Sequence, residues 1–138
     1  MISEQKAMND ILRGFEIYNT KDMSAIGPWY DEILAPNCVY HNPRRLDVVG
    51  RENIKQFVSD LYKRMPDLYH NPPEDIIVQG DKVFVRYSVS RTDPTSGKRQ
   101  TSMLMCIDHY SGDKIIEMWE MVGRWVDEAQ AVLDQRST

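Results

Sequence analysis

The spacing of the hydrophobic residues changes once along this chain of 138 residues, from a helical period before Pro73 to an alternating one after it. Before Pro73, apolar residues recur at steps of three and four, as on one face of an amphipathic helix. After Pro73, apolar and polar residues alternate, and short turns with Gly, Asp and Pro separate the alternating runs. Helices followed by an antiparallel meander predict an α+β fold in which the helices pack on one face of a sheet.

The first half of the chain is expected to hold three helices. The first presents one apolar stripe, made of Met8, Ile11, Leu12, Phe15 and Tyr18, and ends at Asn19–Asp22. Because proline suits the first turn of a helix better than its interior, Pro28 predicts a break after Gly27, with a separate short helix over 28–34. The third helix begins after Gly50 and ends before Pro66.

Five strands and a final helix complete the expected elements. The first strand runs from Cys38 to Asn42 and ends at Pro43, which has no N–H to donate. Four strands follow in the second half: Glu74–Gln79, Lys82–Arg91, Arg99–Tyr110 and Lys114–Val122. Trp125 to Leu133 has the spacing of a helix, so that the chain reads as one domain, 1–138, with a helical tail over 124–138.

The sheet face turned away from the helices is also expected to be apolar. Two series of alternate residues suggest this: Val83, Val85, Tyr87 and Val89, and Met103, Met105 and Ile107. An apolar face of this size is unfavourable in open water unless something covers it. We therefore expect a homodimer that packs sheet to sheet through the outer face.

Charge and composition exclude several classes of function. The chain has 17 Lys and Arg against 21 Asp and Glu, a net charge of -4, which argues against nucleic-acid and anionic-membrane partners. Cys38 and Cys106 lack the spacing of a metal or redox pair, and no metal site is expected. No apolar run has the length of a membrane span, and the first residues lack a hydrophobic signal core, so a cytoplasmic protein with reduced thiols is expected.

Several short blocks of sequence occur in a characteristic order: Phe15–Asp22, Val39–Pro43, Gly50–Ile54, Met65–Asp67, Gly80–Val83 and Gly112–Glu120. Their order and spacing resemble the SnoaL-like polyketide cyclase family of the nuclear transport factor two-like superfamily. The resemblance covers residues 5 to 123. It implies a cone-like fold: a strongly curved antiparallel sheet whose concave face is covered by three N-terminal helices, with a pocket at the open end. Related folds host isomerases, dehydratases, epoxide hydrolases, cyclases and pure binding modules, so function must be argued from the pocket residues.

Comparison with these enzymes selects Glu120. In the similar polyketide cyclases, the general acid/base is an Asp near the end of the last strand, and the matching position here is Glu120. A His that accompanies it in the family falls on Cys106, and the pocket Asn of the family falls on Asn42. No cofactor is implied.

The residues that other members use for different chemistry are replaced here. Enzymes similar to ketosteroid isomerase place their base at the position of Asn42 and their oxyanion-binding Tyr and Asp at the positions of Gly14 and Cys106. Epoxide hydrolases of the superfamily use an Arg-x-Asp element, and the similar stretch here, Arg86-Tyr87-Ser88, lacks the carboxylate. Isomerase, dehydratase and epoxide hydrolase chemistry are therefore disfavoured.

The residues near Glu120 have structural as well as functional interpretations. Alternation places Glu120 on one face with Met118, where burial would raise its pKa toward the value a general base needs. The alternatives are an ion pair with Arg86 and a solvated position at the rim. Arg86 itself is either a ligand anchor or the structural partner of Glu120 or Asp108, which is a further candidate. Cys106 is either a pocket thiol or a small buried hydrophobe.

The first strand and the helices supply the remaining candidates. Tyr40 and Asn42 point the same way, and Asn42 either orients a substrate carbonyl or caps the turn at Pro43. His41 points the opposite way and is a weaker candidate. Trp29 and Phe57, together with Met118, are expected in the core, where some such residues would line a ligand cavity.

The sequence thus leaves three functions open. The first is a cofactor-free cyclase or lyase in which Glu120 acts as general acid/base on a hydrophobic carbonyl compound, with Tyr40, Asn42 and Arg86 holding the oxygen that becomes negative. The second is a non-catalytic domain that binds a ligand or a partner. The third is an isomerase or dehydratase.

Overall fold

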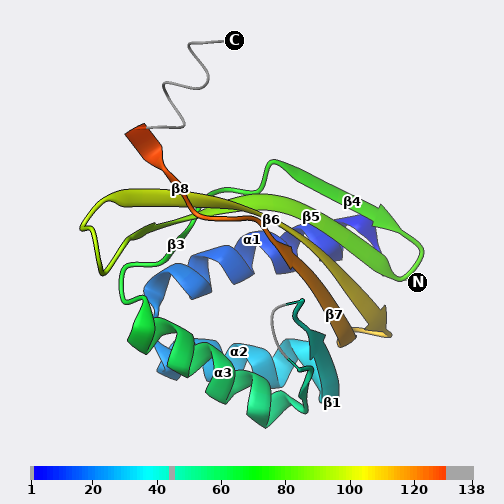
Figure 1. The fold of residues 1–138 in the computed structure, drawn as a ribbon. Helices are drawn as coiled ribbons and strands as arrows, with labels where there is room; N and C mark the ends of the chain where they lie inside the picture. The colour runs from blue at the N-terminus through cyan, green and yellow to red at the C-terminus, as the bar shows by residue number, and fades with distance from the viewer. Residues whose placement is uncertain (1, 44–45, 130–138) are drawn as a thin grey trace.

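Three helices pack against the concave side of one large curved sheet in the computed structural model, which describes residues 2–43 and 46–129 (Figure 1). The helices are α1 (Glu4–Thr20), α2 (Met23–Ile33) and α3 (Arg51–Arg64). The Ser3 side chain caps α1 by accepting a hydrogen bond from the Lys6 N–H at 3.1 Å. The expected α+β, cone-like fold is confirmed.

The sheet is mixed, with the order β2-β1-β7-β6-β5-β3, while β4 pairs with β5 and β8 pairs with β6. Its strands are β1 (Leu34–His41), β2 (Val48–Val49), β3 (Tyr69–His70), β4 (Asp75–Gln79), β5 (Lys82–Thr92), β6 (Arg99–Ser111), β7 (Lys114–Val122) and β8 (Val126–Asp127). The long strands β4 to β7 form the expected meander. The sheet is not antiparallel throughout, because β1 runs parallel to β7, with Tyr40 opposite Met118.

Three local predictions differ from the structure. Helix α2 is continuous through Pro28, which is exposed. The helix begins after the Asp22 cap. Pro28 has no N–H, so one backbone hydrogen bond of the helix, to the Ser24 carbonyl, is missing. Ser24 is exposed, and water can take the place of that donor. Strand β1 begins at Leu34 rather than Cys38. Within the expected final helix, Val126–Asp127 instead pairs with β6, and residues 130–133 lie outside the described residues.

The two faces of the sheet differ more than the sequence suggested. Val83, Val85, Tyr87 and Val89 all face the helices and are at most 6% exposed. Met103, Met105 and Ile107 lie on the outer face and are 38–44% exposed. The two apolar series therefore belong to opposite faces: the first belongs to the core, and only the second contributes to the apolar outer surface.

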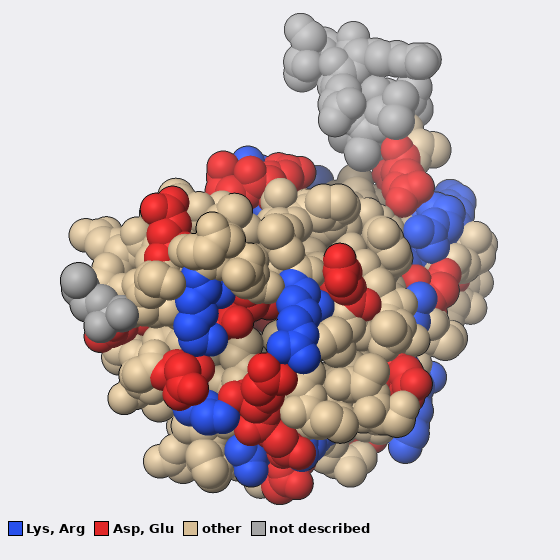
Figure 2. Space-filling view, turned by 180° about the vertical axis from the view of Figure 1, so that it is seen from behind, with Lys and Arg blue, Asp and Glu red and all other residues tan. Residues whose placement is uncertain are grey.

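The surface carries charges of both signs. Figure 2 shows Lys and Arg side chains interspersed with Asp and Glu on the face seen there, without a continuous basic patch. A bound polyanion needs clustered Lys and Arg, and this face does not offer them. Among the described residues, no helix combines the length and the apolar character that a membrane crossing requires.

Candidate active site

A cavity lies between the helices and the concave face of the sheet. Its volume is about 390 Å³. All three helices and strands β1, β5, β6 and β7 contribute to its wall, which is mostly apolar. A mostly apolar cavity with a few polar groups is the usual form of a small-molecule site.

Tyrosine hydroxyls supply many of the polar groups in this wall. Six of the seven tyrosines line the cavity: Tyr18, Tyr30, Tyr40, Tyr62, Tyr87 and Tyr110. The Tyr18 and Tyr30 hydroxyls lie 2.5 Å apart. Burial raises the pKa of each of these six phenols, so they stay neutral hydrogen-bonding groups.

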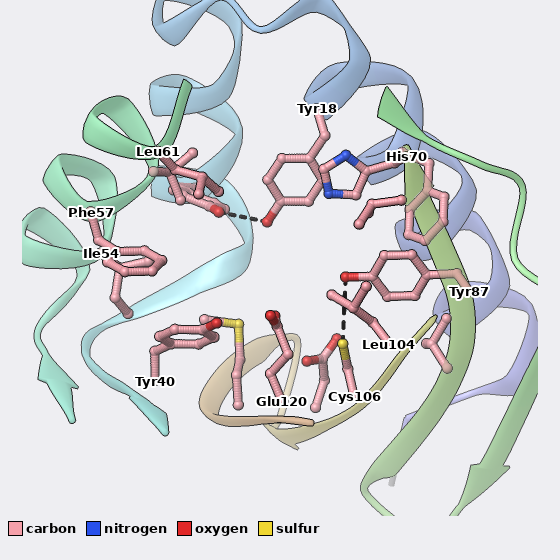
Figure 3. A pocket seen from close by; sticks show the side chains of 18 of the residues that line it. Tyr18, Tyr40, Ile54, Phe57, Leu61, His70, Tyr87, Leu104, Cys106 and Glu120 are labelled. Atoms are coloured by element: carbon pink, nitrogen blue, oxygen red, sulfur yellow. Dashed lines mark hydrogen bonds between the residues drawn. The ribbon is translucent and has the colours of Figure 1, made fainter. Parts of the chain in front are cut away.

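Glu120 lies on the inner face of β7 and lines the cavity, close to Tyr40 (Figure 3). The Tyr40 hydroxyl donates a hydrogen bond to its carboxylate and accepts one from Asn42 Nδ2 at 3.2 Å. Burial raises the pKa of Glu120, and the Tyr40 bond partly opposes this by stabilising the charged form. Strand β1 places Tyr40 and Asn42 together here because it pairs directly with β7.

A second carboxyl group, that of Asp108, lies in the same cavity. In the β6–β7 register Asp108 pairs with Met118 and Cys106 pairs with Glu120, so the two carboxyl groups are diagonal neighbours on the inner face. Burial first, and then the negative charges of Glu120 and Asp10, raise the pKa of Asp108 to about 7. The Asp108 carboxyl group therefore gains and loses a proton near neutral pH, beside a second carboxyl group whose pKa burial also raises.

Cys106 also lines the cavity, between these two carboxyl groups in the register. Its thiol donates a hydrogen bond to the Tyr87 hydroxyl, with Sγ and the oxygen 3.7 Å apart (Figure 3). Burial, together with the nearby carboxyl groups, raises the thiol pKa well above its usual value. Because the thiolate is the nucleophilic form, Cys106 is a neutral wall residue rather than a nucleophile.

Arg86 and His41 do not join the cavity. Arg86 lies on the outer face, where Nε donates to Asp75 at 2.7 Å and a second ion pair joins it to Glu74. It is therefore neither a ligand anchor in the pocket nor the partner of Glu120 or Asp108. His41 also points outward and lies 2.8 Å from Glu117, and this contact raises its pKa.

Trp29, Phe57 and Met118 all contribute to the cavity wall. Trp29 packs against Gly14 of α1, and a Cβ at Gly14 would lie 2.8 Å from the indole ring. The space that a Tyr would need at this position is therefore filled by Trp29. This packing is a physical reason why the oxyanion arrangement of the isomerases cannot form here.

One cavity residue, His70, carries no functional expectation from its sequence context, a loop before Asn71-Pro72-Pro73. It is 9% exposed and its ring is stacked on those of Tyr18 and Tyr87, with centroids 4.9 and 5.8 Å apart. Burial lowers its pKa to about 4, so the ring is neutral at physiological pH. No periodicity surrounds a two-residue strand, which explains why the sequence did not reveal this residue.

Within the described residues, no group of three or more His, Cys, Asp and Glu side chains is arranged to hold a metal ion. The carboxyl groups of Glu120 and Asp108 are accompanied by phenols and one thiol instead. Such a set can transfer protons and hold an oxygen atom through hydrogen bonds.

Comparison with solved structures places the fold among known relatives. A protein assigned as a SnoaL-like polyketide cyclase from Jannaschia sp. CCS1 is 19% identical, with a TM-score of 0.72, and the match covers 96% of this chain and 94% of that one. TsrD from Streptomyces laurentii is 19% identical, with a TM-score of 0.71 and coverage of 98% and 97%. An NTF2-like protein from Anabaena variabilis is 16% identical, with a TM-score of 0.70 and coverage of 90% and 94%.

The family comparison agrees with the structural one. Comparison with curated proteins gave no match. The family model of the SnoaL-like domain matches residues 11–118, which span α1 to most of β7. The chain belongs to the SnoaL-like domain family.

Proposed function

We propose that this protein is a cofactor-independent enzyme that acts on a hydrophobic carbonyl compound through an intramolecular aldol-type reaction, with Glu120 as general acid/base. The observation that carries the proposal is the setting of the Glu120 carboxyl group. It lines a mostly apolar cavity, burial raises its pKa, and its hydrogen-bond partner is the Tyr40 hydroxyl rather than a Lys or Arg side chain. A carboxylate in this setting is a stronger base than one in water.

In the proposed reaction, the Glu120 carboxylate removes a proton from the carbon next to a substrate carbonyl. The Asn42 amide donates to the oxygen on which negative charge develops, and the Tyr40 hydroxyl turns from Glu120 to the same oxygen once Glu120 has taken up the proton. The enolate carbon then attacks a second carbonyl carbon of the same molecule, and a carbon–carbon bond forms. The resulting alkoxide takes a proton from Asp108, and transfer of the proton from Glu120 to Asp108 restores the starting state.

The test begins with the ligand. Native mass spectrometry of the protein purified from its own host identifies a retained small molecule, and that compound and its open-chain analogues are offered to purified variants. Glu120→Gln is expected to lower turnover about 100-fold or more. The matched control is Glu117→Gln, because Glu117 lies on the same strand but bonds to His41 on the outer face. Turnover by Glu120→Gln at the parent rate would show that the proposed mechanism is wrong.

A second candidate function is non-catalytic binding of the same class of ligand. The Cys106 thiol favours it, because the similar cyclases have a His at that position and the raised pKa of this thiol leaves it without acid/base capacity near neutral pH. A binding protein would retain the ligand unchanged in the same mass spectra, and Glu120→Gln would alter affinity alone. Isomerase or dehydratase chemistry is less well supported, because Asn42 replaces the base and Trp29 fills the space beside Gly14.

The proposal includes a homodimer formed through the outer face of the sheet. An apolar row crosses that face from Ile77 through Phe84 and Ile107 to Trp119, following the strand register. Arg86, Glu74 and Asp75 lie beside it and carry both signs of charge, which suits a two-fold interface in which the same patch meets itself. Burial of the row between two copies would remove it from water.

We further propose a cytoplasmic setting. Cys38 and Cys106 are both free thiols. A reducing compartment keeps such thiols unpaired and preserves the Cys106 contact with Tyr87 in the cavity wall.

A further inference from the structure

Hydrogen bonds to two other elements, α1 and β5, hold the backbone at His70 in place. The Asn19 side chain donates to the His70 carbonyl at 2.9 Å and accepts from the His70 N–H at 2.7 Å, which ties β3 to α1. The next residue, Asn71, donates from its side chain to the Ser88 and Ser90 hydroxyls, both at 3.0 Å. This backbone is fixed by side chains on two other elements, so the ring is presented to the cavity in one orientation.

One nitrogen of the imidazole ring is buried without a hydrogen bond. It is Nδ1, which has no partner among the residues that the structure describes, although the ring lines the cavity. Phe15 packs edge-on against the ring at 5.7 Å, and Tyr18 and Tyr87 stack on it. A buried polar atom without a partner costs stability, and a phenyl ring could make these aromatic contacts without that cost. Packing alone therefore does not account for a histidine here.

The position of His70 in the cavity separates it from the acid/base group. Figure 3 shows His70 and Tyr18 on one side of the pocket and Tyr40, Glu120 and Cys106 on the opposite side, with Tyr87 between the two groups. The cavity thus has two polar ends joined by an aromatic and aliphatic wall. A ligand that fills it can be recognised at both ends.

We propose that His70 forms a hydrogen bond with a hydroxyl group at the end of the ligand remote from its reacting carbonyl, so that the site selects a mostly apolar compound with oxygen substituents at both ends. This inference rests on the proposed function, because it requires a carbonyl compound in the cavity. A neutral imidazole has one N–H donor and one acceptor nitrogen, and a hydroxyl group can serve either. Stacking between Tyr18 and Tyr87 keeps the ring plane fixed while the bond forms.

The test uses two probes that differ only at the remote oxygen. One is an acetylnaphthol whose acetyl and hydroxyl groups lie on opposite rings, and the other is its methyl ether. Isothermal titration calorimetry is expected to show that the parent protein binds the naphthol about tenfold more tightly than the ether. In His70→Phe the two affinities should become equal. Equal affinities in the parent protein, or no measurable binding of either probe, would overturn the inference.

A control variant at the opposite end of the cavity distinguishes failure of this inference from failure of the catalytic proposal. Glu120→Gln should change both affinities together and leave their ratio at about tenfold. If the ratio depends on His70 but Glu120→Gln turns over substrate normally, the subsite stands and the aldol mechanism fails. If the ratio is one while Glu120→Gln is inactive, the mechanism stands and the subsite fails.

Two further measurements do not depend on comparing binding affinities. In protein labelled with nitrogen-15 at histidine, the NMR chemical shifts of the His70 ring nitrogens should change when the naphthol is added and change much less with the ether. Identical changes with both probes would contradict the proposal.

Thermal unfolding without ligand should show that His70→Phe melts at or above the parent temperature, because the unpartnered nitrogen is removed. A clear loss of stability, with the naphthol preference intact, would identify His70 as a packing residue.

Discussion

Asp108 and Glu120 are diagonal neighbours on adjacent strands, and both carboxyl groups line one cavity. Burial, the charge of Glu120 and the charge of Asp10 raise the pKa of Asp108 to about 7. The Asp108 carboxyl group therefore gains and loses its proton near neutral pH. Its consequences for stability and for catalysis can be measured separately.

Replacement of Asp108 should stabilise the protein at neutral pH. The folded chain holds a proton on Asp108 up to about pH 7, whereas the unfolded chain releases it near pH 4, so the folded state binds more protons in this window and stability falls as the pH rises through it. Asp108→Asn removes this cost. We expect a gain in the free energy of unfolding on the order of 2–4 kcal/mol at pH 8.

The pH dependence provides the check. Urea unfolding of Asp108→Asn and the parent at several pH values should show the gain shrinking toward zero near pH 4, where the carboxyl group is protonated in both states. Asp75→Asn is a matched control on the outer face, where Asp75 pairs with Arg86. A gain that does not depend on pH would mean that Asp108 is not the group that titrates.

The Tyr40 hydroxyl should set the pH at which Glu120 ionises. Tyr40→Phe removes the donor that stabilises the Glu120 carboxylate, so the pKa of Glu120 should rise further. Titration of carbon-13-labelled glutamate by NMR measures this directly, and the acid limb of a pH–rate profile should move to higher pH in parallel. Tyr69→Phe is the control, because Tyr69 is the tyrosine that does not line the cavity. An unchanged Glu120 titration in Tyr40→Phe would contradict the assigned hydrogen bond.

Two glycine substitutions should have opposite effects on stability. In Gly14→Ala, the new Cβ meets the Trp29 ring at 2.8 Å, and we expect a loss of about 1–3 kcal/mol together with a smaller cavity. In Gly27→Ala, on α2, the Cβ has open space, and the higher helix propensity of alanine should raise stability by up to about 1 kcal/mol. Thermal or urea unfolding compares the free energy of unfolding of the two variants with that of the parent. If Gly14→Ala is as stable as the parent, the Trp29 ring moves away from the new Cβ.

A charge on the outer face should abolish the proposed dimer. Ile107 is 38% exposed at the centre of the apolar row, and Ile107→Lys would place an ammonium group inside the interface. Sedimentation equilibrium should give a dimer for the parent and a monomer for this variant. Leu12→Lys, on α1, changes a somewhat more exposed residue, 47% against 38%, on a helix rather than on the outer sheet face, and should leave the dimer intact. A monomeric parent would refute the interface.

Most local elements could be predicted because local signals fix them. Gly80 and Gly112 adopt positive φ angles of 61° and 63° in the turns of the meander, and these turns set the strand bounds. Helix α3 starts after Gly50 and ends before Met65, as the sequence indicated. Pro28 was misleading because a single missing backbone bond at an exposed position is a small cost beside the packing of Trp29 and Tyr30 on the same helix.

The site could be predicted only in part. Strict alternation on β5 already required that Arg86 face away from Val85 and Tyr87, so its expected place in the pocket conflicted with its own strand. The pairing of β1 with β7 joins residues about 80 positions apart and leaves no local signal. Asp108 received less weight than Glu120 because its environment is set by the neighbouring strand rather than by its own sequence.

The parallel pairing of β1 with β7 has a consequence for folding during synthesis. Apart from the two-residue β2, strand β7 is the sheet partner of β1, and it also carries Glu120. During synthesis, β1 cannot pair with β7 until β7 has left the ribosome. Tyr40 can therefore meet the Glu120 carboxylate only after residues 114–122 have been synthesised.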